Sequence, residues 1–166
     1  RPCSKCCQGL EGQLMLLKHT YSSPVGNIGL LIEDHNLISI SLTNPMLKGL
    51  EAMKDPKSFK DIITQLDEYF FEGRKKFDIA FKISPTNFRL KVYQEMQKIP
   101  YGKSITYSDL AGKVGSPKAF RAVGTACGKN PLPLIIPCHR VKAQSGLGGF
   151  TGGLDIKRFL LNLESN

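Results

Sequence analysis

A cysteine, a histidine and an arginine follow one another at residues 138–140, directly after a proline-rich apolar stretch. A thiolate is a strong nucleophile, and cationic neighbours lower the pKa of a thiol from about 8.5 toward neutrality. Cys138 lies where the apolar residues 132–136 give way to polar ones, rather than within an apolar segment. We therefore interpret Cys138 as a nucleophile, with a buried structural thiol as the alternative.

His139 is the nearest candidate for a base, but its position in the chain limits how it can act. Adjacent side chains of an extended segment point to opposite sides of the backbone. We therefore expect His139 to act on Cys138 through a bridging water and not by direct contact. This expectation weighs against a thiol-dependent hydrolase or acyltransferase, which usually needs a base that contacts the thiol.

Positive charge is concentrated in the second half of the chain. The protein has 166 residues and a formal net charge of +9. Residues 1–85 carry 11 basic and 10 acidic side chains, whereas residues 86–166 carry 12 and 4. A one-sided positive field favours a polyanionic partner, because Lys and Arg contacts to phosphate provide salt-dependent affinity. The alternative is a basic surface that serves solubility alone.

Composition argues against a membrane protein and against a disulfide-stabilised one. No apolar run approaches the roughly 20 residues that span a bilayer. The five cysteines are an odd number, and Cys3, Cys6 and Cys7 lie far from the other two. We expect an intracellular protein, cytoplasmic in a prokaryote and nuclear in a eukaryote, with no metal site. The chain opens on Arg1 instead of methionine, and we expect residues 1–13 to be a disordered leader or foreign residues.

Residues 14–84 have the pattern of an α/β domain. Three strand-like segments are separated by turns around Gly26 and Asn36, which predicts an antiparallel meander. The strands are expected at residues 14–21, 28–33 and 37–42. Apolar residues then recur at helical spacing from Phe59 to Phe70, and Gly73 ends the amphipathic helix that they predict. Alternation over residues 77–81 predicts one further strand.

Residues 85–166 are expected to be mostly helical, beginning after the Ser84-Pro85 junction. One helix is predicted over residues 88–99. Thr106 and Asp109 resemble a capping box for a second, short helix. Ser116 and Pro117 then provide an N-cap and a first-turn proline for a third helix that reaches Cys127. Two short helices joined by a tight turn predict a helix-turn-helix.

The second helix of this pair is rich in small residues. Gly124 within it costs about 1 kcal/mol of helix stability relative to alanine, so a compensating role is expected. Either the helix packs closely on a neighbour, or its surface approaches a DNA groove. Arg121 is correspondingly either a solvated surface residue or a side chain that probes DNA.

Four segments taken together resemble the O6-alkylguanine-DNA alkyltransferase family. They are Arg121-Ala-Val-Gly, Asn130-Pro131, Ile136-Pro-Cys-His-Arg-Val and Thr151-Gly-Gly-Leu. The resemblance implies a ribonuclease-H-like α/β N-terminal domain and a helix-turn-helix, winged-helix-like C-terminal domain. It also implies a monomer that binds the minor groove of double-stranded DNA, with no cofactor.

The resemblance also implies a role for each matching residue. Cys138 accepts the alkyl group, His139 acts as base through water, and Glu164 holds that histidine in its working tautomer. Asn130 braces the segment before the cysteine. The residues expected to contact DNA or the flipped base are Tyr107, Lys118, Arg121, Ala122, Arg140, Val141, Phe150 and Thr151. Among these, Arg121 would fill the space of the extruded nucleotide and Tyr107 would help to swing it out.

The implied activity is direct-reversal DNA repair by a methylated-DNA-protein-cysteine methyltransferase. Cys138 would take the alkyl group from O6-alkylguanine, with O4-alkylthymine as a further candidate substrate. The thioether product resists hydrolysis, so each molecule would act once. Phe150 stands where several relatives have tyrosine, and Thr151 where serine is frequent, which leaves tolerance of bulky alkyl groups open. The alternatives remain a thiol-dependent hydrolase or acyltransferase, and a helix-turn-helix module with a structural cysteine.

Overall fold

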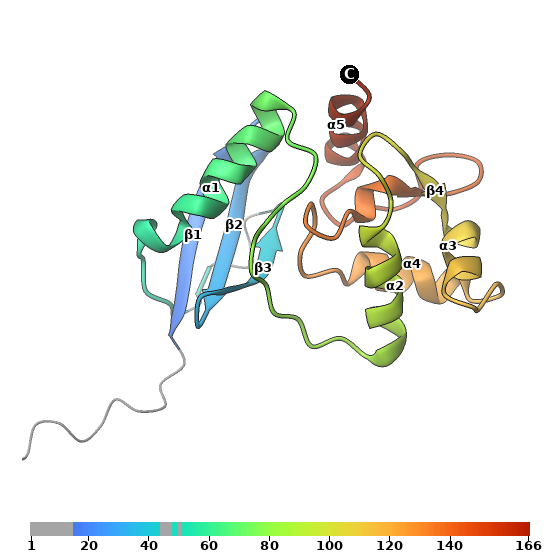
Figure 1. The fold of residues 1–166 in the computed structure, drawn as a ribbon, viewed down its shortest axis with the longest axis horizontal. Coiled ribbons are helices and arrows are strands. Elements are labelled where there is room, and N and C mark those ends of the chain that lie inside the picture. The colour runs from blue at the N-terminus through green and yellow to red at the C-terminus, as the bar shows by residue number, and fades with distance from the viewer. Residues whose placement is uncertain (1–14, 44–47, 50) are drawn as a thin grey trace, which may run out of the picture.

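The computed structural model describes residues 15–43, 48–49 and 51–166 of the chain. A three-stranded sheet with a helix forms the first half, and a cluster of helices lies beside it as the second half (Figure 1). The predicted α/β unit followed by a mostly helical unit is therefore confirmed. The leader 1–13, with its three cysteines, lies outside the described residues. Within the described ranges, no helix is long and apolar enough to cross a membrane.

The sheet is the antiparallel meander that the sequence predicts. Its strands pair in chain order and are β1 (Leu16–Ser23), β2 (Gly26–Glu33) and β3 (Asn36–Ser41). Gly26 closes the first turn at a φ of 107°, a value that side chains disfavour. Asp34 and His35 form the second turn with φ of 45° and 66°, as a two-residue type I′ hairpin requires.

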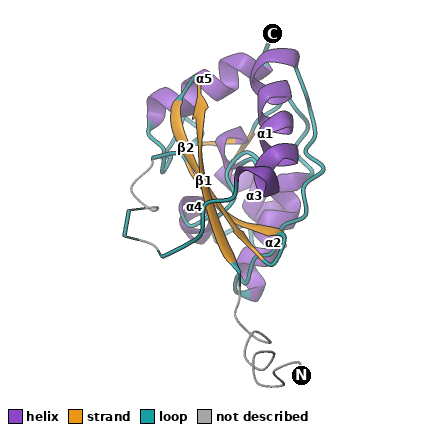
Figure 2. Ribbon diagram, turned by 90° about the vertical axis from the view of Figure 1, so that its left-hand side faces the viewer, coloured by secondary structure: helices purple, strands orange, loops and turns teal. Residues whose placement is uncertain are grey.

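Helix α1 (Lys60–Asp67) lies along this sheet (Figures 1 and 2). A π-helical turn (Glu68–Glu72) continues it, and Gly73 ends it at a left-handed φ of 75°, as a C-terminal glycine stop does. The Tyr21 hydroxyl of β1 donates to Asp67 Oδ1 at 2.7 Å. The buried residues of this helical segment are Ile62, Leu66, Tyr69 and Phe70, and Phe59 directly before it is buried as well.

The strand predicted over residues 77–81 is wrong. The segment makes a single parallel bridge from Phe81 to Leu37 of β3, with bonds from Leu37 N to Ala80 O and from Lys82 N to Leu37 O. The same edge of β3 is used further along by the second half, because Ile40 N donates to Pro131 O at 2.8 Å. The edge is thus divided between two segments, and neither runs far enough along it to form a strand.

The second half contains four helices and two very short strands in its described residues. They are α2 (Asn87–Gln97), β4 (Ile105–Thr106), α3 (Tyr107–Lys113), α4 (Phe120–Gly128), β5 (Val141–Lys142) and α5 (Leu154–Glu164). The capping box of Thr106 and Asp109 is confirmed. Helices α3 and α4 pack against each other as the predicted helix-turn-helix.

The start of α4 differs from the prediction. The expected cap at Ser116 is wrong, because α4 begins at Phe120 and its N-cap, Ala119, makes no side-chain hydrogen bond. Residues 116–119 instead form a turn closed by Ala119 N donating to Ser116 O at 2.8 Å. The first turn of α4 therefore has backbone N–H groups without a capping side chain, next to Arg121.

Candidate active site

Cys138 is presented by a single 3₁₀ turn, Cys138–Arg140, that follows Pro137. Cys138 N donates to Ile136 O at 2.8 Å, and Arg140 N donates to Pro137 O at 3.1 Å. The expected extended conformation is therefore wrong. With three residues per turn, neighbouring side chains still diverge, so His139 and Cys138 leave the backbone in different directions.

The Cys138 side chain is buried but lines two cavities. One, of about 450 Å³, adjoins α4 and α3 and is lined by Tyr107, Gly124, Gly128, Phe150 and Thr151 with Cys127 and Cys138. The other, of about 430 Å³, is closed on its far side by residues 39–43 at the end of β3. The sulfur therefore lies between a cavity beside the helix-turn-helix and a cavity walled by the first half.

Burial raises the pKa of the Cys138 thiol above its ordinary value. A hydrogen bond from Asn130 and the charge of Lys157 act in the opposite direction, since both favour the thiolate. The expectation that His139 and Arg140 lower this pKa toward neutrality is wrong, because desolvation is the larger effect. The resting cysteine is a protonated thiol.

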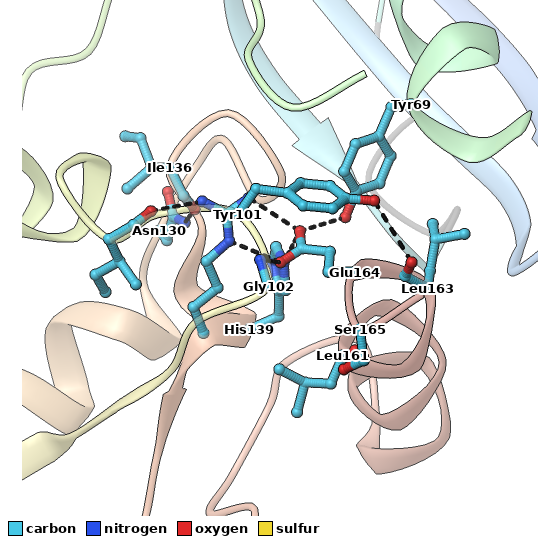
Figure 3. Close-up of polar contacts among 12 residues, drawn as sticks. Tyr69, Tyr101, Gly102, Asn130, Ile136, His139, Leu161, Leu163, Glu164 and Ser165 are labelled. Carbon is cyan, nitrogen blue, oxygen red and sulfur yellow. Dashed lines mark hydrogen bonds and ion pairs between the residues drawn. The ribbon is translucent and has the colours of Figure 1, made fainter. Parts of the chain in front are cut away.

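His139 is fully buried and is held by Glu164. Its Nε2 lies 2.7 Å from Glu164 Oε1 (Figure 3). An ionised carboxylate only accepts hydrogen bonds, so Nε2 carries the proton and Nδ1 carries the lone pair. Burial lowers the pKa of His139, which keeps the imidazole neutral. Nδ1 is buried and has no hydrogen-bond partner among the described residues, so it is free to accept a proton.

Glu164 is the last residue of α5 and is brought back to the cysteine, as the family resemblance requires. Besides His139, it accepts hydrogen bonds from Arg140 Nε to Oε2 at 2.8 Å and from the Tyr69 hydroxyl to Oε1 at 2.7 Å. Burial alone would raise the pKa of Glu164, but the hydrogen bonds from His139, Arg140 and Tyr69 lower it to about 2. The carboxylate is charged at every physiological pH.

Arg140 does not lie where a DNA-contacting side chain would. It is buried, with Nε and Nη2 on the two oxygens of Glu164 and Nη1 donating to Ile99 O at 2.7 Å. The expectation that Arg140 contacts DNA or substrate is therefore corrected: its guanidinium neutralises Glu164. A bidentate pair suits this task, because an unpaired buried carboxylate is costly.

Asn130 connects the end of α4 to the segment that precedes Cys138. Its Nδ2 donates to Ile136 O at 2.7 Å, and its Oδ1 accepts from Leu132 N at 3.0 Å (Figure 3). The predicted bracing position thus has the geometry to hold this segment. The amide also reaches the Cys138 thiol, where it favours the charged form.

The remaining predicted residues fall into two groups. Lys118 is exposed in the turn that precedes α4, and Arg121 and Ala122 are exposed in the first turn of the helix. Tyr107, Phe150 and Thr151 line the cavity beside α4, and Val141 is buried just behind the cysteine. The Tyr107 hydroxyl donates to Gly149 O at 3.3 Å, and Thr151 Oγ1 donates to Gly128 O at 3.0 Å. The structure thus separates an exposed surface around the first turn of α4 from a cavity that Cys138 lines.

Two site residues were missed by sequence reasoning. Lys157 is fully buried, and its Nζ donates to Val141 O at 2.6 Å and to Gly149 O at 3.2 Å. Its spacing with Leu160 and Glu164 on one face of α5 was the available signal. Tyr69 likewise lies on the apolar face of the α1 segment, but nothing in the sequence indicates that its hydroxyl reaches Glu164.

The described ranges hold no group of three or more His, Cys, Asp or Glu side chains that could bind a metal. Cys127 and Cys138 are both free and buried. The possible ligands Cys3, Cys6 and Cys7 lie outside the described residues.

Two family models together match nearly the whole chain. The model for the 6-O-methylguanine DNA methyltransferase ribonuclease-like domain matches residues 16–85, and that for the DNA binding domain of the same family matches residues 87–166. The chain belongs to this family. The α/β first half with its antiparallel sheet is accordingly the family's ribonuclease-like domain, and the helical second half is its DNA-binding domain.

Individual relatives agree with this membership. A methylated-DNA–protein-cysteine methyltransferase of Metallosphaera sedula is 40% identical over 153 residues, which cover 92% of this chain and 95% of the relative. The corresponding protein of Methanosarcina acetivorans is 38% identical, covering 88% and 96%. A crystal structure of Mycobacterium tuberculosis OGT in complex with DNA superimposes with a TM-score of 0.84 at 35% identity, covering 90% and 92%. Family membership supports alkyl transfer to a cysteine over both the hydrolase and the binding module.

Proposed function

We propose that Cys138 removes alkyl groups from O6 of guanine in DNA by taking them onto its own sulfur. The observation that carries the proposal is the position of the thiol: it lines the cavity beside α4 and is followed directly by the histidine that Glu164 holds. In the reaction the sulfur–carbon bond forms while the bond between that carbon and guanine O6 breaks. The bonding electrons leave with guanine, which takes up a proton.

His139 supplies the base for the thiol proton. Its Nε2–H is engaged by Glu164, and its buried Nδ1 is the lone-pair site. We infer that a water relays the Cys138 proton to Nδ1, because adjacent residues of a 3₁₀ turn diverge. Glu164 then stabilises the imidazolium that forms, as the carboxylate does in other acid–base pairs. Asn130 and Lys157 stabilise the developing thiolate in a site whose burial opposes it.

DNA is held by the exposed start of α4. Lys118 and Arg121 are exposed there, and the basic side chains of residues 86–166 supply salt-dependent attraction to phosphates. A guanine inside a duplex cannot reach a buried thiol, so the nucleotide is flipped out through the minor groove. Arg121 takes its place in the stack, Ala122 allows close approach, and Tyr107 guides the base into the cavity.

The product is a thioether, and none of the described groups beside Cys138 offers a route back. Cys127 could resolve a disulfide by thiol exchange, but it cannot displace an alkyl group from sulfur. Each molecule therefore repairs one lesion. We infer that it does so as a monomer, in the compartment that holds the genome. O4-alkylthymine is a second possible substrate, because its alkyl group is also carried on an exocyclic oxygen.

Mass spectrometry of the peptide that contains Cys138 tests this proposal. One equivalent of duplex DNA with a single O6-methylguanine should add one methyl group to that peptide and leave the protein inert to a second equivalent. Cys138→Ser should take up no methyl group while still binding the duplex. Repeated turnover would support a hydrolase-like activity, and binding without modification would support a structural cysteine; either result would contradict the proposal.

A further inference from the structure

Tyr69 belongs to the first half of the chain, yet its hydroxyl reaches the carboxylate that serves the histidine. It lies in the π-helical turn Glu68–Glu72 and is only 1% exposed. The hydroxyl donates to Glu164 Oε1 at 2.7 Å, across 95 residues of sequence (Figure 3). The ribonuclease-like half thus contributes a polar group to a charge cluster otherwise built by the DNA-binding half.

The same carboxylate oxygen serves Tyr69 and His139. Glu164 Oε1 accepts from the Tyr69 hydroxyl and from His139 Nε2, at 2.7 Å in both cases. A shared acceptor couples the two donors, because each bond draws on the same negative charge. The position of the carboxylate, and so the orientation of the imidazole ring, depends on both.

The Tyr69 ring has little freedom to move away. It packs edge-on against Phe70 and Tyr101, with ring centroids 5.2 and 6.3 Å apart, and tilted against Phe77 at 5.3 Å. Phe70 and Phe77 come from the first half, whereas Tyr101 comes from the second. The hydroxyl is therefore held at Glu164 only while the two halves are packed together.

We propose that Tyr69 is a positioning residue for alkyl transfer, through which docking of the ribonuclease-like half completes the Glu164–His139 pair behind Cys138. The inference rests on the proposed function and adds to it a role for the first half. Tyr69 touches neither the thiol nor the alkyl group. It acts through Glu164, by fixing the carboxylate and sharing its charge.

Loss of the hydroxyl should change how readily His139 takes up a proton. Without the bond from Tyr69, more of the negative charge of Glu164 acts on the imidazole, and the imidazolium becomes more stable. The other titratable and charged groups around the pair are Arg140 and Tyr101 beside Glu164, and Lys157, Arg140 and Cys138 beside His139. A variant that removes only the hydroxyl leaves all of these in place.

Tyr69→Phe is that variant, and Tyr21→Phe is its matched control. Phenylalanine keeps the aromatic packing and deletes one oxygen. Tyr21 also donates to a carboxylate at 2.7 Å, Asp67 Oδ1, within the same half of the protein. That bond joins β1 to α1 and involves none of the groups around Cys138. A general loss of stability from a missing tyrosine hydroxyl should therefore appear in both variants.

The experiment is single-turnover methyl transfer from duplex O6-methylguanine to the protein of residues 1–166, measured from about pH 5.5 to 9. Tyr69→Phe should react roughly tenfold more slowly than wild type, because loss of one charge-assisted hydrogen bond leaves the Glu164 carboxylate, and with it the His139 ring, less well oriented, and this outweighs the more stable imidazolium. In a plot of the rate constant against pH, the midpoint of the low-pH fall should also move to higher pH. His139 must be neutral to accept the proton, and a more stable imidazolium loses its proton only at higher pH. Tyr21→Phe should keep both the rate constant and the midpoint of wild type.

The amplitude and the rate constant of the methyl-transfer time course distinguish a folding defect from a slower reaction. The amplitude counts competent molecules, so partial misfolding of Tyr69→Phe lowers it without moving the pH midpoint. A wild-type rate constant and midpoint in Tyr69→Phe would overturn the inference, and so would equal changes in both variants. Absence of methylation of wild-type Cys138 would overturn the proposed function itself. This result comes from the wild-type protein alone and does not depend on the variants.

Discussion

The thiol of Cys138 must lose its proton at a position that disfavours charge. Burial raises its pKa, and the Asn130 hydrogen bond, the Lys157 charge and the backbone N–H groups of Cys138 and His139 offset only part of this effect. A permanently formed thiolate would be open to oxidation and to stray electrophiles. In the proposed mechanism, burial keeps the sulfur protonated until a substrate is bound and His139 takes the proton. For a protein that reacts once, this protects its single equivalent of nucleophile.

Glu164 should make the stability of the protein pH-dependent. Its pKa is lowered from 4.5 to about 2 in the folded state. A depressed carboxyl pKa stabilises the fold above the unfolded value, and this stabilisation is lost as pH falls through the folded value. We expect Glu164→Gln to lower the free energy of unfolding by about 3 kcal/mol near neutral pH. The difference from wild type should shrink as pH falls from 4.5 toward 2.

Urea unfolding of both proteins at a series of pH values measures this difference, and subtraction removes the contribution of the other carboxyl groups. Glu72→Gln is a suitable control, because it makes the same substitution at an exposed carboxyl of the first half. The difference in the free energy of unfolding between wild type and Glu164→Gln could instead stay constant down to about pH 2. That result would show that the hydrogen bonds to Glu164 do not lower its pKa.

At the scale of single residues, sequence reasoning is informative where chemistry is local. Cys138 and His139 could be predicted because their types and adjacency are informative by themselves. Arg140 was misassigned because its neighbours in sequence suggest an exposed basic group, whereas its real partners, Ile99 and Glu164, are distant in the chain. Tyr69 was missed for the same reason. The hydrogen bond from Tyr69 to Glu164 joins residues 95 positions apart and depends on how the two halves pack. Local sequence patterns cannot predict such a contact.

Helix α4 was predicted correctly as a helix, but its N-cap and its first residue differ from the prediction. Its small residues predicted either close packing on a neighbour or approach to DNA. A Cβ added at Gly124 would meet nothing within 4 Å, so close packing within the protein does not explain this glycine. Its position on the cavity that contains Cys138 favours the second explanation.

Gly124→Ala should therefore stabilise the protein and slow its reaction. Alanine gains about 1 kcal/mol of helix propensity, which corresponds to a rise in Tm of about 2–4 °C for a chain of this size. The new methyl group would narrow the cavity between α4 and Thr151 and hinder entry of the base. We expect slower methyl transfer from duplex DNA, measured beside a thermal melt of the same preparation.

Gly112→Ala in α3 is the matched control, since a Cβ there also meets nothing within 4 Å and Gly112 lines none of the cavities around Cys138. It should raise the Tm without slowing the reaction. If Gly124→Ala were destabilising, or stabilising with an unchanged rate, the glycine would have to be explained by something other than access to the cavity.

The sheet edge illustrates why the strand at residues 77–81 could not be judged from its pattern. Alternation of apolar residues reports that one side of a segment is buried, not that its backbone has a strand to pair with. Here β3 bonds to this segment at Leu37 and to Pro131 at Ile40. The meander was predictable because its turns are local, whereas this edge is shared between distant segments.

In the whole molecule, the first half does more than support the second. The end of β3 walls the cavity on one side of Cys138, and Tyr69 bonds to Glu164 behind it. Both contacts join the two halves of the chain, which differ strongly in net charge. The first half is nearly neutral, and the second carries 12 basic and 4 acidic side chains. Attraction to DNA should therefore depend on basic residues of the second half, while the first half acts on the chemistry.

Salt dependence of binding to undamaged duplex tests this division. The logarithm of the association constant should fall linearly with the logarithm of salt concentration, with a slope of about −0.9 for each phosphate neutralised.

Lys118→Ala, in the exposed turn before α4, should make this slope shallower by about one unit and weaken binding to any sequence. Lys75→Ala removes an exposed lysine from the first half and should leave the slope unchanged, since the proposed DNA-binding surface belongs to the second half. Fluorescence anisotropy titrations at several salt concentrations measure both. A slope near zero in wild type, or an equal loss in the two variants, would mean that the positive charge of the second half does not form the DNA-binding surface.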